Sequence, residues 1–177
     1  MIFIFGLVFF QLMMMATADC SPKLDNAVVE DLFAMLVKYK GEFRNYRKWR
    51  DIPAFTASLS ASQTINANDV VKFDKVWTNN GNHYNAKTGI FQAAREGLYH
   101  VSATVMSTQG KTVHVRIWQN ENKTVGLYPG TGFSEATANM VLHLKKGDKV
   151  TVKGGGGHTA LFGNSEHYSM FSAYLIA

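Results

Sequence analysis

The chain of 177 residues contains one cysteine and three prolines, and charged residues make up only 18% of it. A single cysteine excludes a disulfide-stabilised scaffold and a cysteine-rich metal site. The low charge and the 12% of aromatic residues exclude a disordered chain, because disordered segments are rich in charge and poor in aromatics. The length suits one ordinary domain with a short appendage.

Long apolar runs are scarce, since only Ile2 to Met15 is almost wholly apolar. This run is shorter than the roughly 20 residues that span a bilayer. It ends in Ala16-Thr17-Ala18, a small-x-small pattern that suits signal peptidase. We therefore expect residues 1–18 to be a cleaved signal peptide and the mature protein to be secreted, without membrane insertion. An uncleaved N-terminal anchor is the alternative.

Cys20 would lie two residues into the mature chain. In an oxidising compartment an odd cysteine usually finds a partner on another chain, so we expect an interchain disulfide at Cys20. The alternative is a frayed terminal thiol capped with glutathione.

Residues 19–50 have the pattern of a short helical stalk. Ser21-Pro22 has the features of an N-cap followed by proline at the first helical position. Apolar residues then recur at alternating spacings of three and four, which predicts a coiled coil of about three heptads. An amphipathic helix packed on its own domain is the alternative. The predicted seam consists of Val29, Leu32, Leu36, Tyr39, Phe43 and Tyr46.

Four cations, Arg44, Arg47, Lys48 and Arg50, gather near the end of this helix. We expect them to complement the helix macrodipole and to stay solvated. A glycosaminoglycan or anionic-surface site is the alternative. Nucleic acid is not an expected partner of a secreted chain whose remaining charges are of mixed sign.

After Asp51 the period of the hydrophobic pattern changes from 3.5 to 2. Short alternating segments recur to the C-terminus, bounded by turn sequences such as Asn79-Asn80-Gly81 and Lys146-Gly147-Asp148. With no helical pattern between them, they predict an all-β antiparallel sandwich over residues 51–177. The alternation also places Trp118 on the face opposite the core side of its strand. We expect this ring to be exposed and to need a partner surface.

Several fragments of this region occur in a fixed order. They are Ala54-Phe55-Thr56-Ala57, Val71-x-Phe73-Asp74-x-Val76, Tyr84-Asn85, Thr88-Gly89-x-Phe91, Gly97-Leu98-Tyr99-x-Val101, Val113-x-Val115, Leu142-x-Leu144-x-x-Gly147-Asp148-x-Val150 and Phe171-Ser172-x-x-Leu175. In this order and spacing, from about Ile52 to Ala177, the chain resembles the globular head domain of complement C1q and its tumour-necrosis-factor-like relatives.

The resemblance implies a ten-stranded antiparallel jelly-roll sandwich that assembles as a compact homotrimer. Relatives commonly carry a collagen-like stalk, whereas this chain has no Gly-x-y repeat. We therefore expect the coiled coil to take over trimerisation. Five large residues are expected to pack in the core or the trimer contact: Phe55, Phe73, Tyr99, Leu144 and Phe171.

The sequence carries no ordered catalytic or metal-binding motif. Six histidines occur without H-E-x-x-H, cysteine-pair or calcium-loop spacing. Gly132-Phe133-Ser134-Glu135-Ala136 approaches the G-x-S-x-G elbow, but no helix is expected after it. We expect no enzyme, no catalytic residues, no required cofactor and no metal site. Calcium, which helps some relatives, stays open for Asp74, Asp148 and Glu135.

Asn122-Lys123-Thr124 is an N-glycosylation sequon between two predicted strands, so Asn122 is an expected glycosylation site.

The resemblance implies a secreted pattern-recognition protein of innate immunity, with lectin-like binding of carbohydrate or other microbial-surface ligands. Three weak sites on one trimer would gain avidity. The alternatives are a cytokine-like or synaptic-organiser-like ligand of a protein receptor, and a matrix or mineral-associated protein. Ligand contacts are expected from loops at one end of the sandwich, at Trp77, Asn80, Tyr128, Glu135 and His158.

Overall fold

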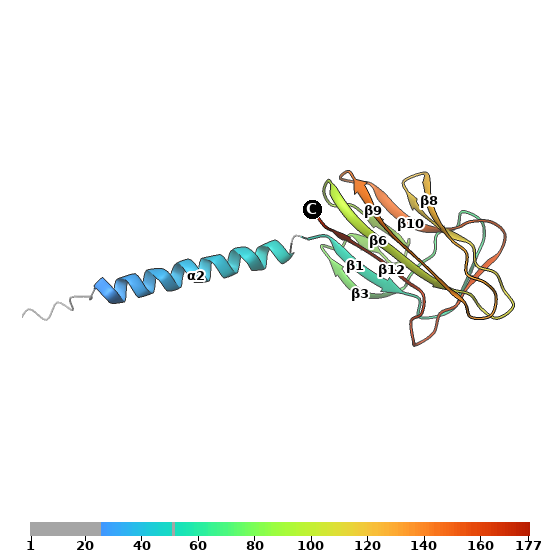
Figure 1. Ribbon diagram of the computed structural model, residues 1–177, viewed down its shortest axis with the longest axis horizontal. Coiled ribbons are helices and arrows are strands. Elements are labelled where there is room, and N and C mark those ends of the chain that lie inside the picture. The colour runs from blue at the N-terminus through green and yellow to red at the C-terminus, as the bar shows by residue number, and fades with distance from the viewer. Residues whose placement is uncertain (1–25, 51) are drawn as a thin grey trace, which may run out of the picture. The chain divides into compact units, whose positions relative to one another are not determined.

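The structure, a computed structural model, describes residues 26–50 and 52–177 (Figure 1). Side chains of the helix are described for residues 28–40. The chain divides into two units, Met1–Asn45 and Tyr46–Ala177, which we treat separately. The predicted signal peptide at residues 1–18 and the predicted disulfide at Cys20 lie outside the described residues.

Helix α2 spans Asn26–Arg50 and contains the predicted seam. Within its described part, the seam residues Val29, Leu32, Leu36 and Tyr39 are all exposed in the single chain. Their neighbours Val28, Phe33, Met35 and Val37 are exposed as well, so the apolar surface is wider than a two-position seam. The coiled coil therefore stays a prediction. This helix, taken over its described length, lacks the sustained apolar character needed to cross a bilayer.

The β domain is a sandwich of two five-stranded antiparallel sheets. The first has the order β3-β1-β12-β6-β9, the second the order β4-β5-β10-β7-β8, and β11 pairs with β2 in a separate ribbon. The expected ten-stranded sandwich is thus present, with the ribbon added. The strands are β1 Ala54–Ser58, β2 Gln63–Ile65, β3 Lys75–Asn80, β4 Tyr84–Asn85, β5 Ile90–Gln92, β6 Gly97–Met106, β7 Val115–Gln119, β8 Asn122–Leu127, β9 Glu135–Leu144, β10 Lys149–Gly154, β11 Thr159–Leu161 and β12 Met170–Leu175.

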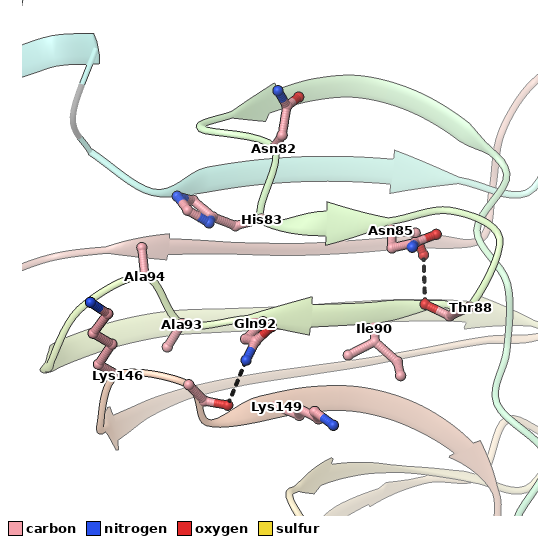
Figure 2. A pocket seen from close by; sticks show the side chains of 11 residues that line it. Asn82, His83, Asn85, Thr88, Ile90, Gln92, Ala93, Ala94, Lys146 and Lys149 are labelled. Carbon is pink, nitrogen blue, oxygen red and sulfur yellow. Dashed lines mark hydrogen bonds between the residues drawn. The ribbon is translucent and has the colours of Figure 1, made fainter.

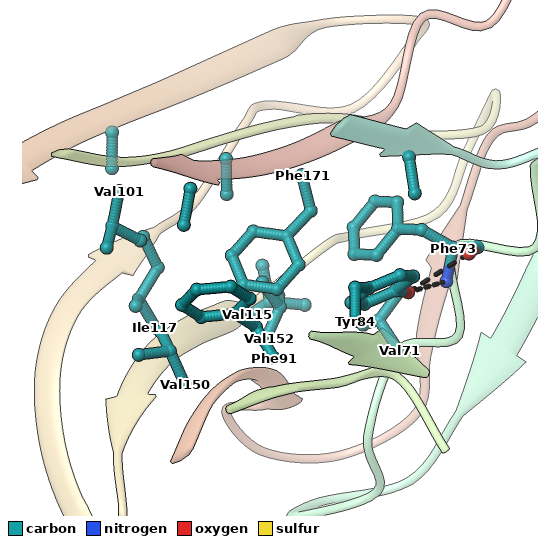
Figure 3. Packing of buried hydrophobic residues seen from close by; sticks show 14 of the residues in the cluster. Val71, Phe73, Tyr84, Phe91, Val101, Val115, Ile117, Val150, Val152 and Phe171 are labelled. Atoms are coloured by element: carbon teal, nitrogen blue, oxygen red, sulfur yellow. Dashed lines mark hydrogen bonds between the residues drawn. The ribbon is translucent and has the colours of Figure 1, made fainter. Parts of the chain in front are cut away.

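The two sheets enclose one core, built by the alternation seen in the sequence. Along β6, every second residue from Tyr99 to Val105 is fully buried and the residues between face outward. Aromatic rings fill the centre, among them Tyr84, Phe91 and Phe171 (Figure 3). Phe55 stacks on Tyr84 at 4.4 Å and meets Phe171 edge-on at 4.9 Å. The residues expected to be large and buried all have at most 2% exposure: Phe55, Phe73, Tyr99, Leu144 and Phe171.

The expectation that Trp118 is exposed is wrong. It faces away from the core as predicted, yet only 8% of it is exposed. The ammonium groups of Lys153 and Lys123 lie 4.5 Å and 5.4 Å from its ring centroid. Cation–π attraction holds these side chains there, and their apolar stems cover indole surface that strand alternation alone would leave open.

Tyr84 ties the segment before β3 to the core. Its buried hydroxyl accepts a hydrogen bond from the Phe73 N–H at 3.1 Å and donates one to the Phe73 carbonyl at 3.0 Å. Burial raises the pKa of this phenol, so the hydroxyl keeps its proton and both roles at neutral pH.

Replacing Tyr84 by Phe is expected to lower the free energy of unfolding by about 1–3 kcal/mol, because both Phe73 backbone groups lose their partner. Urea titration at fixed protein concentration measures this. The matched control is Tyr128→Phe, since that side chain is 66% exposed. Equal effects of the two substitutions would contradict the assignment.

Candidate functional site

The outward face of the first sheet carries an apolar flank made of Leu98, Val141, Tyr174 and Ile176, each 43–56% exposed. Register places Tyr174 and Val141 on either side of His100 in neighbouring strands. Backbone hydrogen bonds join Leu98 to the C-terminal residues beside it. Such a cluster on a single chain marks a surface suited to protein contact.

His100 lies at the centre of this apolar flank. Its ring packs against Tyr174 with the centroids 5.0 Å apart. Its Nδ1 is buried and has no hydrogen-bond partner within the described part of the chain. Buried polar atoms in native proteins are almost always satisfied, so this nitrogen points to a partner from outside the single chain.

Trp77 is presented at the edge of the same sheet by a β-bulge. The register of β3 against β1 shifts where Thr56 pairs with Thr78 and Ala57 with Val76, which leaves Trp77 as the extra residue. Its side chain is 54% exposed. A β-bulge changes the direction of the extra side chain. Here it turns the Trp77 indole ring to solvent at the edge of the sheet.

A small polar network fixes the ring. The Trp77 Nε1 donates to the Ser58 hydroxyl at 2.8 Å, and this hydroxyl lies 3.1 Å from the His167 Nδ1. The His167 ring meets Trp77 edge-on at 5.0 Å, and the Lys75 ammonium lies 5.4 Å from the indole centroid. We call Ser58, Lys75, Trp77 and His167 the Trp77 cluster. It offers a fixed aromatic surface with polar groups beside it, the arrangement on which sugars stack.

Sequence reasoning missed His167. Its backbone adopts a left-handed conformation with φ of 58°, which is uncommon for a residue other than glycine. The turn is held by Asn164, whose carbonyl accepts from the His167 N–H and whose side chain accepts from the Glu166 N–H. The Gly163-Asn164 pair predicts a turn. No local sequence signal shows that this turn packs against Trp77, 90 positions before His167.

The five predicted contact residues do not form one site. Trp77 and Asn80 belong to strand β3 and not to a loop. Asn80 pairs with Ala54 at the end of the sheet where the chain enters the domain, and its side chain donates to the Ile52 carbonyl. The Asn79-Asn80-Gly81 pattern predicted the turn correctly, but strand β3 extends as far as Asn80. Asn80 therefore has a structural role in the sheet and not a loop position.

Tyr128, Glu135 and His158 lie nearer the end of the sandwich opposite to Asn80. Glu135 begins β9 and pairs with Met106, the last residue of β6. Tyr128 is 66% exposed and meets the ring of His114 edge-on at 5.4 Å. His158 follows the glycine run, where a Cβ on Gly155 would approach the His114 ring to 2.7 Å, so this loop passes directly over His114.

The three acidic residues left open for calcium do not converge within one chain. Glu135 and Asp148 flank opposite ends of β9, about 30 Å apart for a strand of ten residues. Asp74 accepts hydrogen bonds from the backbone and hydroxyl of Ser60. No three His, Cys, Asp or Glu side chains among the described residues gather to hold a metal ion.

Asp148 organises the turn between β9 and β10. The Lys145 N–H donates to its carboxylate at 3.0 Å, and the side chains of Asn120 and Gln119 donate at 3.1 Å and 3.3 Å. These hydrogen bonds lower the pKa of Asp148 below its ordinary value of 3.8, and the bond from the Lys145 N–H has the largest effect.

A lowered pKa in the folded state makes stability depend on pH. As the pH falls, the Asp148 carboxylate is protonated at a higher pH in the unfolded chain than in the folded one. The stability that Asp148 contributes above pH 3.8 is therefore lost as the pH falls toward the lower pKa of the folded state. The loss of stability between pH 6 and pH 3 is therefore expected to be smaller in Asp148→Asn than in the wild type. Urea midpoints at both pH values measure this, and an unchanged difference would contradict the assignment.

The predicted glycosylation site has an exposed acceptor. Asn122 begins β8, directly after the Asn120-Glu121 turn of the β7–β8 hairpin, and its side chain is exposed. Thr124 is half-buried and donates to the Ile117 carbonyl at 2.7 Å. Occupancy by glycan stays a prediction.

A depression of about 520 Å³ opens on the outer face of the second sheet, and sequence reasoning did not identify it. Figure 2 shows Lys146 and Lys149 along one side, with Asn82 and His83 on the other. Gln92 lies between them and donates to the Gly147 carbonyl at 3.2 Å. Its lining mixes apolar side chains such as Ile90 with the amides of Asn82, Asn85 and Gln92 and the two ammonium groups, and the polar groups are suited to hydroxylated and anionic ligands.

Comparison with known proteins connects this geometry to one family. The family model described as C1q domain matches residues 54–176. The complement C1q tumor necrosis factor-related protein 3 of Mus musculus is 35% identical over 127 residues, which are 70% of this chain and 50% of that protein. The heavy metal-binding protein HIP of Mytilus edulis is 29% identical over 103 residues, 56% of this chain and 48% of that one. The chain thus spans about half the length of the curated relatives it matches.

The fold also occurs in solved structures. The globular domain of the zebrafish complement 1qA protein superposes with a TM-score of 0.57 at 18% identity, covering 72% of this chain and 98% of that domain. The Eiger tumour necrosis factor of S. frugiperda gives 0.59 at 15% identity, covering 71% and 93%. At these identities the likeness concerns the fold alone.

Proposed function

The chain belongs to the C1q-domain family, and from this premise we propose that it is a secreted homotrimeric protein that recognises carbohydrate or other microbial-surface ligands by multivalent, lectin-like binding. The observation that carries the proposal is the apolar flank. A single chain exposes Leu98, Val141, Tyr174 and Ile176 together, with the unpartnered His100 nitrogen among them. Packing three copies along this face removes the apolar surface from water.

The Trp77 cluster supports a carbohydrate ligand. A half-exposed indole fixed through its N–H to Ser58 presents a rigid face at low entropic cost. One such shallow site binds weakly, whereas three on one trimer raise the apparent affinity by about 10²–10⁴ through effective concentration. Binding without turnover is in keeping with the C1q-domain family.

The first test is light scattering of the mature protein with and without reductant. We expect three subunits under reducing conditions and six without reductant, if Cys20 links two trimers. A monomer in both conditions would overturn the proposal, because the avidity argument needs joined copies.

The second test is binding to immobilised mannan, a neutral polysaccharide. Trp77→Ala is expected to lower binding at least tenfold, of the order seen for buried aromatic anchors. Trp77→Phe keeps a ring and is expected to retain most of the binding. If a panel of cell-surface receptors captures the trimer while mannan and other glycans do not, the alternative of a cytokine-like or synaptic-organiser-like ligand replaces this proposal.

A further inference from the structure

The outer face of the second sheet carries a row of cations, which we call the basic band: Arg116, Lys123, Lys146, Lys149 and Lys153. Lys149 and Lys153 alternate on β10 with the fully buried Val150 and Val152, so they face away from the core. Lys153 pairs in register with Arg116 on β7. Lys123 shares the Trp118 ring with Lys153, and Lys146 lines the depression with Lys149. Three strands and one turn thus present their positive charges on one surface.

Few negative charges oppose the basic band. Hydrogen bonds from the Lys145 N–H and the side chains of Asn120 and Gln119 keep the Asp148 carboxylate ionised, so it offsets one of the five cations. Glu121 lies 3.9 Å from the Lys153 ammonium and offsets a second cation; the Glu121 side chain is 92% exposed and that of Lys153 16%, so water screens the pair only in part. Two negative charges thus stand against five cations. The band therefore keeps a net positive potential that attracts an anionic partner.

Trp118 lies at the centre of the band. With Lys153 and Lys123 both over its ring, the two ammonium groups are within about 10 Å of each other and repel. The Trp118 Nε1 is buried and has no hydrogen-bond acceptor within the described part of the chain. Among the described residues, neither the indole nor its immediate neighbours supplies an acceptor to offset the two ammonium groups, so this part of the band stays positive and favours an anionic ligand over it.

The shape of the band favours an extended ligand. From Lys149 to Lys153 the strand advances about 13 Å, and the neighbouring strands add about 5 Å each across the sheet. The depression at one end supplies Asn82, Asn85 and Gln92, neutral groups that match hydroxyls. Repeated anions and hydroxyls on one chain are the chemistry of a sulfated or uronic-acid polysaccharide.

Other polyanions fit less well. Single-stranded nucleic acid is held by bases stacked on exposed aromatic rings, whereas Trp118 is only 8% exposed. A peripheral membrane site combines cations with inserted apolar side chains. On this face Ile90 is half-buried in the depression, and the exposed Tyr128 lies just beyond the end of β8, where its ring packs edge-on against His114. Within the described residues, the five cations therefore have little exposed apolar surface between them.

We propose that the basic band is a second carbohydrate site on each subunit, which binds sulfated or uronic-acid polysaccharides across β10, β7 and β8. This inference rests on the proposed lectin function and gives it a ligand class that the Trp77 cluster, with its neutral stacking surface, does not supply. The two sites lie on different sheets, so one trimer can bind neutral and anionic sugars at separate surfaces.

The experiment uses the full mature chain and heparin-derived oligosaccharides as the probe. Lys149→Gln with Lys153→Gln is expected to weaken binding about tenfold near 0.15 M salt and to flatten its salt dependence. The matched control, Lys72→Gln with Lys111→Gln, removes the same charge from exposed positions outside both the band and the Trp77 cluster and is expected to change affinity less than twofold. Equal losses in the two double variants, or no loss in the first, would overturn the proposal.

The Trp118 indole N–H reports on the location, because it lies within the band. We expect its NMR signal, assigned by its absence in Trp118→Phe, to shift on titration with the oligosaccharide while that of Trp77 stays. A shift of the Trp77 signal alone would place the anionic ligand elsewhere and overturn the assignment. Binding that leaves both indole signals unchanged would also overturn the assignment. The binding would then be attributed to the cations of the predicted stalk: Arg44, Arg47, Lys48 and Arg50.

Parallel titrations separate this inference from the proposed function. Mannan binding that depends on Trp77, with no heparin binding, overturns the basic band and leaves the lectin function standing. Heparin binding that depends on Lys149 and Lys153, without mannan binding, supports the band and removes the neutral-sugar site. Single-stranded DNA or phosphatidylserine vesicles that bind the band more tightly than heparin would overturn the polysaccharide assignment.

Discussion

Phe171→Ala is expected to lower the free energy of unfolding by about 3–5 kcal/mol, the range for emptying an aromatic side chain from a packed core. Phe171 is fully buried on β12, the central strand of the first sheet. Its ring meets Phe55, Phe73 and Tyr84 at centroid distances of 4.9, 5.7 and 6.2 Å, so the truncation leaves three aromatic neighbours beside a cavity.

Urea unfolding at one fixed protein concentration measures this effect, since an oligomer's stability depends on concentration. Tyr128→Ala serves as the control, because it also removes an aromatic ring but from a position 66% exposed. We expect the control to change stability by less than about 0.5 kcal/mol. A loss below 1 kcal/mol for Phe171→Ala would contradict the core described above.

Val141→Glu is expected to dissociate the proposed trimer and to lower the apparent affinity for a multivalent glycan surface by about 10²–10⁴. Val141 is 56% exposed in the single chain, so the carboxylate is solvated in a free subunit and the fold is retained. Packing the apolar flank against another copy would bury that charge without a partner, which costs several kcal/mol per contact.

The measurements are light scattering for the oligomeric state and glycan-surface binding for avidity, with circular dichroism to show that the fold persists. Val76→Glu is the matched control, since it makes the same change at a valine 37% exposed that lies on β3 outside the flank. If Val141→Glu remains a trimer, the flank is not the assembly surface.

The sequence predicted the fold in some detail because its signals are local and repeated. Alternation of period two in segments such as Leu98 to Met106 places Tyr99 and Val101 inward without knowledge of the partner strand. Turn residues mark the hairpins, as at Gly81, whose φ of 78° needs glycine. The five large core residues follow from this pattern and from the family resemblance.

The candidate site was only partly predictable. Trp77 was chosen from its residue type and an expected loop position, whereas it lies in β3, and the bulge that turns it outward depends on pairing with β1. His167 reaches the same ring from a turn 90 residues later, held by contacts that have no counterpart in nearby sequence. Trp118 was misjudged because its cover comes from Lys153 on β10 as well as from Lys123 in its own hairpin.

The amino-acid sequence by itself determined the all-β sandwich, its buried aromatic core and its membership of the family, because alternation and turn chemistry act between residues close in the chain. Tertiary structure alone decided which outward side chains became neighbours: the apolar flank from β6, β9 and β12, the Trp77 cluster, and the basic band from β7, β8, β10 and a turn. Those surfaces arise from register between strands far apart in the chain, and register is set by the packing of the whole core.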